Sequence, residues 1–281
     1  MRTNDLDYSR TDDQNISETH QQENCKSISK EQFIHVILEI STLLLESGAH
    51  CERINRNVQR IAQKTNFEVE MLLSFTAISI SISDKNKPEL STTKNKRVKH
   101  HGAHFGILTK TSLLTWKFAE GKISFEELSY ELSQLKSTPK YHIWYVRLSI
   151  GIACGCLCLL AGGDWIDGIF ALLASVVGLI VRQEMTIKQF NLMIVIVCSS
   201  FITTTVAGLN VLYDFGKFPE SSVATAVLFL IPGVPLINCI IDLIEGYIPT
   251  GIARGTFGGF ILLCIAIGMF LSMTLIGINN F

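Results

Sequence analysis

Charge is scarce in the second half of this 281-residue chain. Residues 143–281 carry only 12 of the 49 Lys, Arg, Asp and Glu residues and none of the seven histidines. Runs of about 18 or more nearly uncharged residues are long enough to cross a hydrocarbon core of about 30 Å. The scarcity excludes a water-soluble second half, so we expect a soluble region followed by a membrane region.

A secretory signal is missing as well. Residues 1–30 are rich in Asp, Glu, Gln, Asn and Ser and lack the apolar segment of a signal peptide. This absence predicts that the soluble region stays in the cytoplasm. The polar composition predicts a disordered tail over residues 1–28, followed by a cytoplasmic domain over 29–140 and a transmembrane domain over 141–281.

Motifs of common enzyme chemistry are also absent. The chain has no G-x-S-x-G, H-E-x-x-H or P-loop pattern, and His50 beside Cys51 is not interpreted as a nucleophile pair. The eight cysteines follow no paired framework, and no basic stripe with interleaved aromatics suggests nucleic acid. His100, His101 and His104 lie in the basic segment "KNKRVKHHGAHFG" without a nearby carboxylate or thiol. We interpret this segment as a solvated loop and expect no metal and no cofactor.

Five apolar runs are candidate membrane helices, at about 143–161, 166–181, 190–210, 222–246 and 255–277. Lys and Arg gather at alternate ends of these runs, whereas the opposite ends are mainly acidic. By the positive-inside rule, the N-terminus is then cytoplasmic and the C-terminus lies outside. The predicted fold class is an α-helical polytopic membrane protein of five transmembrane helices with an N-terminal cytoplasmic α+β domain.

The soluble region has the patterns of an α+β domain. Helices are expected over about 29–48, 50–64, 105–119 and 124–136, where apolar residues recur at helical spacing. Ser124 and Glu127 have the spacing of a capping box. Residues 67–83 approach the two-residue period of strands, and the alternation is cleanest from Ala77 onward.

Small residues in the first two apolar runs have the spacing of helix contacts. Gly151 and Gly155 repeat in the first run, and Gly168, Ala171, Ser175 and Gly178 lie in the second. Such stripes allow close backbone approach between membrane helices, so we expect these residues to serve helix packing.

The fourth run contains a predicted helix break. Pro232 and Pro235 flank Gly233, and a proline removes a backbone donor and clashes with the preceding turn. Unwound backbone at membrane depth is tolerated only when protein buries it or when it lines a wet cavity. The half-helix after Pro235 points its positive end toward the membrane interior, which favours a bound carboxylate.

Asn238, Asp242 and Glu245 follow the break at spacings of four and three, which places them on one face of the half-helix. Ionisable groups within a span are costly, so a transport or proton-relay role is the default interpretation. The alternative is that both carboxylates lie at the lipid headgroups and mark the helix end. Arg182 and Arg254 could attract an anionic solute or serve only as topology anchors.

Several separated segments carry a family resemblance. They are "LLLESGAHCERI" at 43–54, "STTKN" at 91–95, "GGDWIDGIFALLASVVGLIVRQ" at 162–183, and "PGVPLIN" at 232–238 followed by Asp242, Gly246, "TGIAR" at 250–254 and Gly255. With these motifs in order from about residue 31, the chain resembles the threonine/serine exporter (ThrE) family. The similarity is strongest to its shorter YjjP-like members, each one subunit of a two-component exporter of the YjjP/YjjB type.

The resemblance implies inner-membrane export of small solutes: threonine and serine in long single-chain members, and succinate in the two-subunit form. It implies a second small membrane subunit (YjjB-like) as partner, hence a hetero-oligomer, and no enzyme activity. The residues that match the family motifs are Pro232, Gly233, Pro235, Asn238, Asp242, Arg254, Gly48 and Arg53.

Two other functions stay open at this point. The soluble domain could be a catalytic domain that the membrane helices anchor, or a sensor that binds a cytoplasmic ligand. The sequence also leaves open which carboxylate solute is exported and which ion drives its movement.

Overall fold

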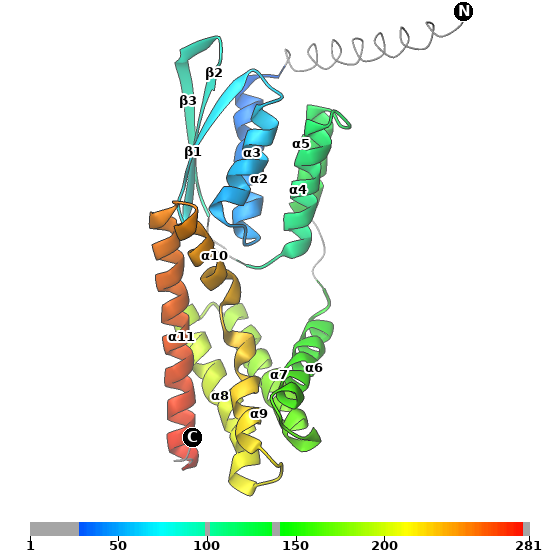
Figure 1. The fold of residues 1–281 in the computed structure, drawn as a ribbon, viewed down its shortest axis with the longest axis vertical. Helices are drawn as coiled ribbons and strands as arrows, with labels where there is room; N and C mark the ends of the chain where they lie inside the picture. Colours follow the sequence, from blue (N-terminus) through cyan, green and yellow to red (C-terminus); the bar gives the residue numbers. More distant parts are fainter. Residues whose placement is uncertain (1–27, 99–101, 137–140, 278–281) are drawn as a thin grey trace, which may run out of the picture. The chain divides into compact units, whose positions relative to one another are not determined.

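The computed structural model describes residues 28–98, 102–136 and 141–277 (Figure 1). The chain forms two compact units: unit 1 contains residues 1–138 with 237–254, and unit 2 contains 139–236 with 255–281. The tail expected to be disordered lies outside the described residues, apart from Ile28. The predicted domain division near residue 140 stays a prediction.

Unit 1 combines four helices with a three-stranded antiparallel sheet of order β1-β2-β3 (Figure 1). Its elements are α2 (Lys30–Glu46), α3 (Cys51–Ala62), β1 (Phe67–Leu73), β2 (Ala77–Asp84), β3 (Lys87–Arg97), α4 (Phe105–Ala119) and α5 (Phe125–Lys136). The expected mixture of helices and strands in this part of the chain is therefore observed.

The alternation in β2 produces the core of unit 1. Ile78, Ile80 and Ile82 are fully buried and join the buried faces of α2 and α3 in one apolar cluster. Burying an aliphatic side chain of this size contributes about 1.5–3 kcal/mol, so this cluster is the main reason that the sheet and helices hold together.

Strand β3 is a correction to the sequence interpretation. Its sequence, KPELSTTKNKR, contains one large aliphatic residue, Leu90, and so offers no apolar period. The segment is nevertheless a strand, because β2 pairs with it from Ala77 opposite Arg97 to Asp84 opposite Lys87. The interpretation of the basic segment as a loop is therefore wrong for residues 94–97.

Helix ends in unit 1 follow from their terminal residues. The predicted capping box is confirmed: the amide of Ser124 donates to Glu127 Oε2 at 2.8 Å, and the amide of Glu127 donates to Ser124 Oγ at 3.2 Å. His104 caps α4, whereas His100 and His101 lie outside the described residues. Gly48 follows α2 with a φ of 87°, a conformation that favours glycine.

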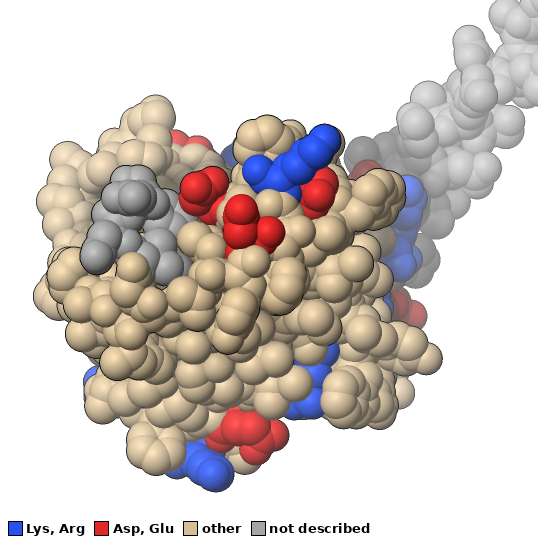
Figure 2. Space-filling model, turned by 90° about the horizontal axis from the view of Figure 1, so that it is seen from below, with Lys and Arg blue, Asp and Glu red and all other residues tan. Residues whose placement is uncertain are grey.

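The described residues of unit 2 form helices joined by turns and short irregular segments. Its elements are α6 (Ile143–Leu160), α7 (Trp165–Ile187), α8 (Leu192–Tyr213), α9 (Pro219–Ala226) and the 3₁₀ helix η1 (Leu228–Leu230), while α10 (Gly233–Ile244) and α11 (Ile248–Ile276) each contribute to both units. Of the helices in the described chain, α6, α7, α8 and α11 are each long and apolar enough to cross a membrane. In the space-filling view, most of the visible surface is neither acidic nor basic (Figure 2).

The fifth candidate span is broken where the prolines predict it. The segment Pro219–Leu230 and helix α10 qualify as a span together, but they are bent by 64° at the break. Ile231 is extended, and α10 starts at Gly233 with Pro235 in its first turn. The described residues thus contain four or five candidate spans, depending on whether this bent pair is counted as one.

Glycine contacts between α6 and α7 confirm the predicted packing. A Cβ atom on Gly155 would lie 2.9 Å from the carbonyl oxygen of Gly168, and one on Gly151 would lie 2.6 Å from Val176 Cγ2. The helices therefore approach to a distance that only glycine permits at these two positions.

Candidate functional site

The candidate site lies in unit 1, where the turn between α2 and α3 contacts α10 and the start of α11. In this turn, residues 47–50, the carbonyl oxygens that follow α2 lie near the first amide group of α3. Helix ends leave such groups without partners inside the helix. Side chains from α10 and α11, nearly 200 residues later, provide those partners.

Asn238 and Arg254 bind the carbonyl groups that follow α2. Asn238 Nδ2 donates to the carbonyl oxygen of Gly48 at 2.8 Å, and Arg254 Nη2 donates to that of Ala49 at 3.0 Å. Both side chains are buried. A cationic group is favourable here because the C-terminal end of a helix carries partial negative charge.

Asp242 binds the opposite kind of helix end. Its Oδ1 accepts a hydrogen bond of 2.8 Å from the amide of Cys51, the first residue of α3. His50 is the N-cap residue of α3 but makes no side-chain cap, so the carboxylate of Asp242 fills that role from another part of the chain.

Asp242 and Arg254 also form a buried ion pair. Asp242 Oδ2 lies 3.2 Å from Arg254 Nη1, and the two side chains are 0% and 4% exposed. The facing atoms are close but misaligned, because neither Oδ2 nor Nη1 makes a hydrogen bond. Removing one partner of such a pair costs about 3–5 kcal/mol, since it leaves a buried charge uncompensated.

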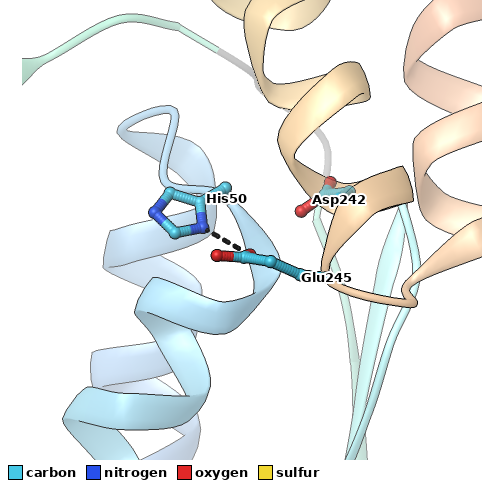
Figure 3. Close-up of side chains that lie close together, drawn as sticks. All are labelled: His50, Asp242 and Glu245. Carbon is cyan, nitrogen blue, oxygen red and sulfur yellow. Dashed lines mark hydrogen bonds and ion pairs between the residues drawn. The ribbon is translucent and has the colours of Figure 1, made fainter.

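Glu245 and His50 extend this cluster toward solvent. Glu245 Oε2 lies 3.0 Å from His50 Nδ1, and their side chains are 27% and 17% exposed. Figure 3 shows Asp242 and Glu245 converging on His50 from the end of α10. Further contacts join Tyr247 to Glu52 at 3.1 Å and Thr250 to the carbonyl of Leu73 at 2.8 Å.

The thiol of Cys51 lies beside this cluster and is fully buried. Burial raises its pKa from 9.0 to about 12, and the charge of Asp242 adds to the effect. A thiol in this state is protonated at neutral pH and is a poor nucleophile. This agrees with the interpretation of Cys51 as an unreactive residue.

The structure brings four of the candidate transport residues into one cluster: Asn238, Asp242, Glu245 and Arg254 all contact residues 48–51. Of the three residues predicted to break the helix, Pro232 lies just before α10, and Gly233 and Pro235 lie in its first turn; a Cβ on Gly233 would contact nothing within 4 Å. Gly48 takes part through its carbonyl oxygen. A transport role for these residues stays a prediction.

Two of the predicted site residues, Arg182 and Arg53, lie outside this cluster. Arg182 is on α7 in unit 2, so it does not belong to the unit that contains Asp242. Arg53 is on α3, and its Nη2 lies 3.5 Å from Ser112 Oγ on α4.

Unit 2 contains a second buried polar cluster, which was not predicted from the sequence. Asp167 is fully buried; its Oδ1 accepts from Asn210 Nδ2 at 2.7 Å, and its Oδ2 accepts from the amides of Phe218 and Asp164 at 3.1 and 2.9 Å. The cluster joins the start of α7 to the end of α8 and the segment before α9. A signal was present, because Asp167 and Asn210 are polar residues inside or beside apolar runs.

Comparison with known proteins identifies the chain. A family model described as "Putative threonine/serine exporter" (ThrE) matches residues 35–276. The chain belongs to the threonine/serine exporter family. "Probable succinate transporter subunit YjjP" of Klebsiella aerogenes is 27% identical over 86% of this chain and 93% of its own length, and the Escherichia coli K12 protein of the same name is 26% identical over 86% and 94%.

A longer relative is the "Probable threonine/serine exporter" of Mycobacterium tuberculosis, 23% identical over 88% of this chain but 46% of its own length. No solved structure matches the chain. Membership of the exporter family, together with several apolar helices, makes this chain a multi-pass membrane protein of a transporter family.

Proposed function

We propose that this exporter-family chain is one subunit of a secondary transporter that moves a small carboxylate solute out across the bacterial inner membrane. The observation that carries the proposal is the buried pair of Asp242 and Arg254, twelve residues apart, with Asp242 on the helix that follows the proline break. Buried ionisable groups next to broken helices are typical of solute and proton sites in transporters.

The pair supports a coupling step in which a proton and a solute bind to the site together and leave it together. Arg254 neutralises Asp242 while no solute is bound, at a distance of 3.2 Å. A proton on Asp242 removes the charge that holds Arg254, and the guanidinium can then pair with the carboxylate of a solute. Loss of that proton restores the ion pair and displaces the solute.

The start of α10, in unit 2, is a separate candidate contact for a solute carboxylate. A helix N-terminus carries partial positive charge, and Gly233 leaves the backbone open there. Serine, threonine and succinate all carry the carboxylate that this arrangement requires. The curated relatives are named for these same solutes, which supports them as the candidates.

We place the N-terminal region in the cytoplasm and the C-terminus outside, on the distribution of Lys and Arg between the spans. Alkaline phosphatase fused after Gln189 should be inactive, and phosphatase fused after Phe215 or Phe281 should be active, because the enzyme folds only outside the cytoplasm. The opposite pattern of activity would reverse the proposed orientation.

A second small membrane subunit completes the proposed transporter, since the relatives of similar length are named as subunits. The test is efflux of labelled serine, threonine and succinate from cells that express this chain alone or with a candidate partner. Export of one solute only when both chains are present supports the proposal. Full export by this chain alone contradicts the two-subunit form, and no export of any of the three solutes contradicts the assigned solute class.

A further inference from the structure

We propose that His50, Asp242 and Glu245 form a binding site for a divalent transition-metal ion. One potential ligand atom from each residue lies within 4.8 Å of the other two. The ligands come from two segments: His50 precedes α3, and the two carboxylates lie at the end of α10 (Figure 3). From the sequence we expected no metal and weighed only His100, His101 and His104 as ligands. His50 was not weighed with Asp242, because more than 190 residues separate the two.

The donor set fits a metal of the zinc or manganese class. Imidazole nitrogen and carboxylate oxygen bind such ions at about 2.0–2.2 Å, so ligands of one ion lie roughly 3–4 Å apart. His50 Nδ1 and Glu245 Oε2 already meet that spacing at 3.0 Å. Asp242 needs a shift of about one ångström toward them to complete a three-ligand site.

The carboxylate of Asp242 in this cluster is incompletely hydrogen-bonded. Asp242 is 0% exposed, yet its Oδ2 makes no hydrogen bond. A buried polar atom without a hydrogen bond is rare in folded proteins and is costly, because water no longer solvates it. Arg254 Nη1 faces this oxygen at 3.2 Å without a hydrogen bond, so a metal ion bound to the same carboxylate would add an interaction that the guanidinium does not supply.

The surroundings of the site would hold its ligands in place and let an ion enter. The amide of Cys51 fixes Asp242 through Oδ1 at 2.8 Å, and Arg254 Nη1 lies 3.2 Å from Oδ2, so the ion would share that oxygen with the guanidinium. Glu245 and His50 are partly exposed, so an ion can arrive from solvent. Arg254 contributes one positive charge against two carboxylates, so the cluster retains a net negative charge that a divalent ion would neutralise.

The proposed ion would connect the turn after α2 to the end of α10. This inference goes beyond the proposed transport function and does not rest on it, because binding can be measured without any transport. If zinc does not bind, the efflux experiments still test export. If export fails, the zinc measurements still test the site.

The test is isothermal titration of the full-length protein in detergent with ZnCl₂ alone, and separately with MgCl₂. We expect one saturable zinc site per chain and no comparable heat from magnesium, which does not favour imidazole ligands. His50→Ala and Glu245→Gln should each weaken zinc binding at least tenfold. Equal binding of magnesium would contradict the assigned class of metal.

The chain provides a matched control on α2. His35 and Glu39 form a similar pair, with Nδ1 3.9 Å from Oε2, but lie one turn apart on α2 with side chains 73% and 12% exposed. His35→Ala should bind zinc as the unmodified protein does. A circular-dichroism spectrum that matches the unmodified protein shows that each variant is folded. Absence of saturable zinc binding, or unchanged binding in a folded His50→Ala, Glu245→Gln double variant, would overturn the proposal.

Discussion

Asp242 accepts a hydrogen bond of 2.8 Å from the amide of Cys51, which lies 191 residues earlier in the chain. The carboxylate caps α3 in place of the N-cap side chain, while Asn238 and Arg254 bind the carbonyl groups that follow α2. Residues expected to act in transport therefore also hold together the two helices of the N-terminal region. Variants at these positions must be judged by stability as well as by export.

Asn238→Ala should lower the free energy of unfolding by about 1–3 kcal/mol, because it leaves the carbonyl of Gly48 without its donor. Thermal or denaturant unfolding of the protein in detergent measures this change. Asn95→Ala, at an exposed position on β3, is the control and should change stability by less than about 0.5 kcal/mol. Equal effects of the two substitutions would show that the contact with Gly48 contributes nothing.

Gly155→Ala should destabilise the packing of α6 against α7 by about 1–3 kcal/mol, because the added Cβ would lie 2.9 Å from the carbonyl oxygen of Gly168. Gly259→Ala on α11 is the matched control, since a Cβ there meets nothing within 4 Å. The midpoint of thermal unfolding in detergent compares them. A loss of stability in Gly259→Ala as large as that in Gly155→Ala would contradict the predicted close contact.

The thiol of Cys51 should resist iodoacetamide at pH 8 in the folded protein and react after denaturation. Burial raises its pKa to about 12, so the reactive thiolate is scarce at this pH. The raised pKa also makes stability depend on pH. Between about pH 9 and 12 the folded state keeps the proton while the unfolded state loses it, so the free energy of unfolding falls as pH rises through that window. Mass spectrometry of alkylated peptides measures the reactivity, and rapid labelling of the folded protein would contradict the burial of Cys51.

Local patterns in the sequence were sufficient to predict much of this fold. Apolar runs indicated the membrane helices, the spacing of Ser124 and Glu127 indicated a helix start, and Pro232 indicated the break before α10. Each of these features depends on interactions within a few residues. Strand β3 could not be predicted in this way, because its pairing with β2 supplies the hydrogen bonds that its own polar sequence does not announce.

The candidate site was predictable only in part for the same reason. The spacing of Asn238, Asp242 and Glu245 along one helix indicated that they act together. Their contacts with the turn after α2 are long-range, and a single sequence contains no signal for such pairs. His50 illustrates the limit, since its role becomes visible only when Glu245 is found 3.0 Å away.

The central claim is that Asp242 is a proton-accepting group in solute export. Asp242→Asn keeps a side-chain oxygen that can accept from the amide of Cys51, but it removes the charge that pairs with Arg254. Asp214→Asn, at the exposed end of α8, is the matched control. Efflux of the exported solute should be abolished in Asp242→Asn and unchanged in Asp214→Asn, with both variants inserted in the membrane at normal levels. Normal efflux by Asp242→Asn would contradict the account.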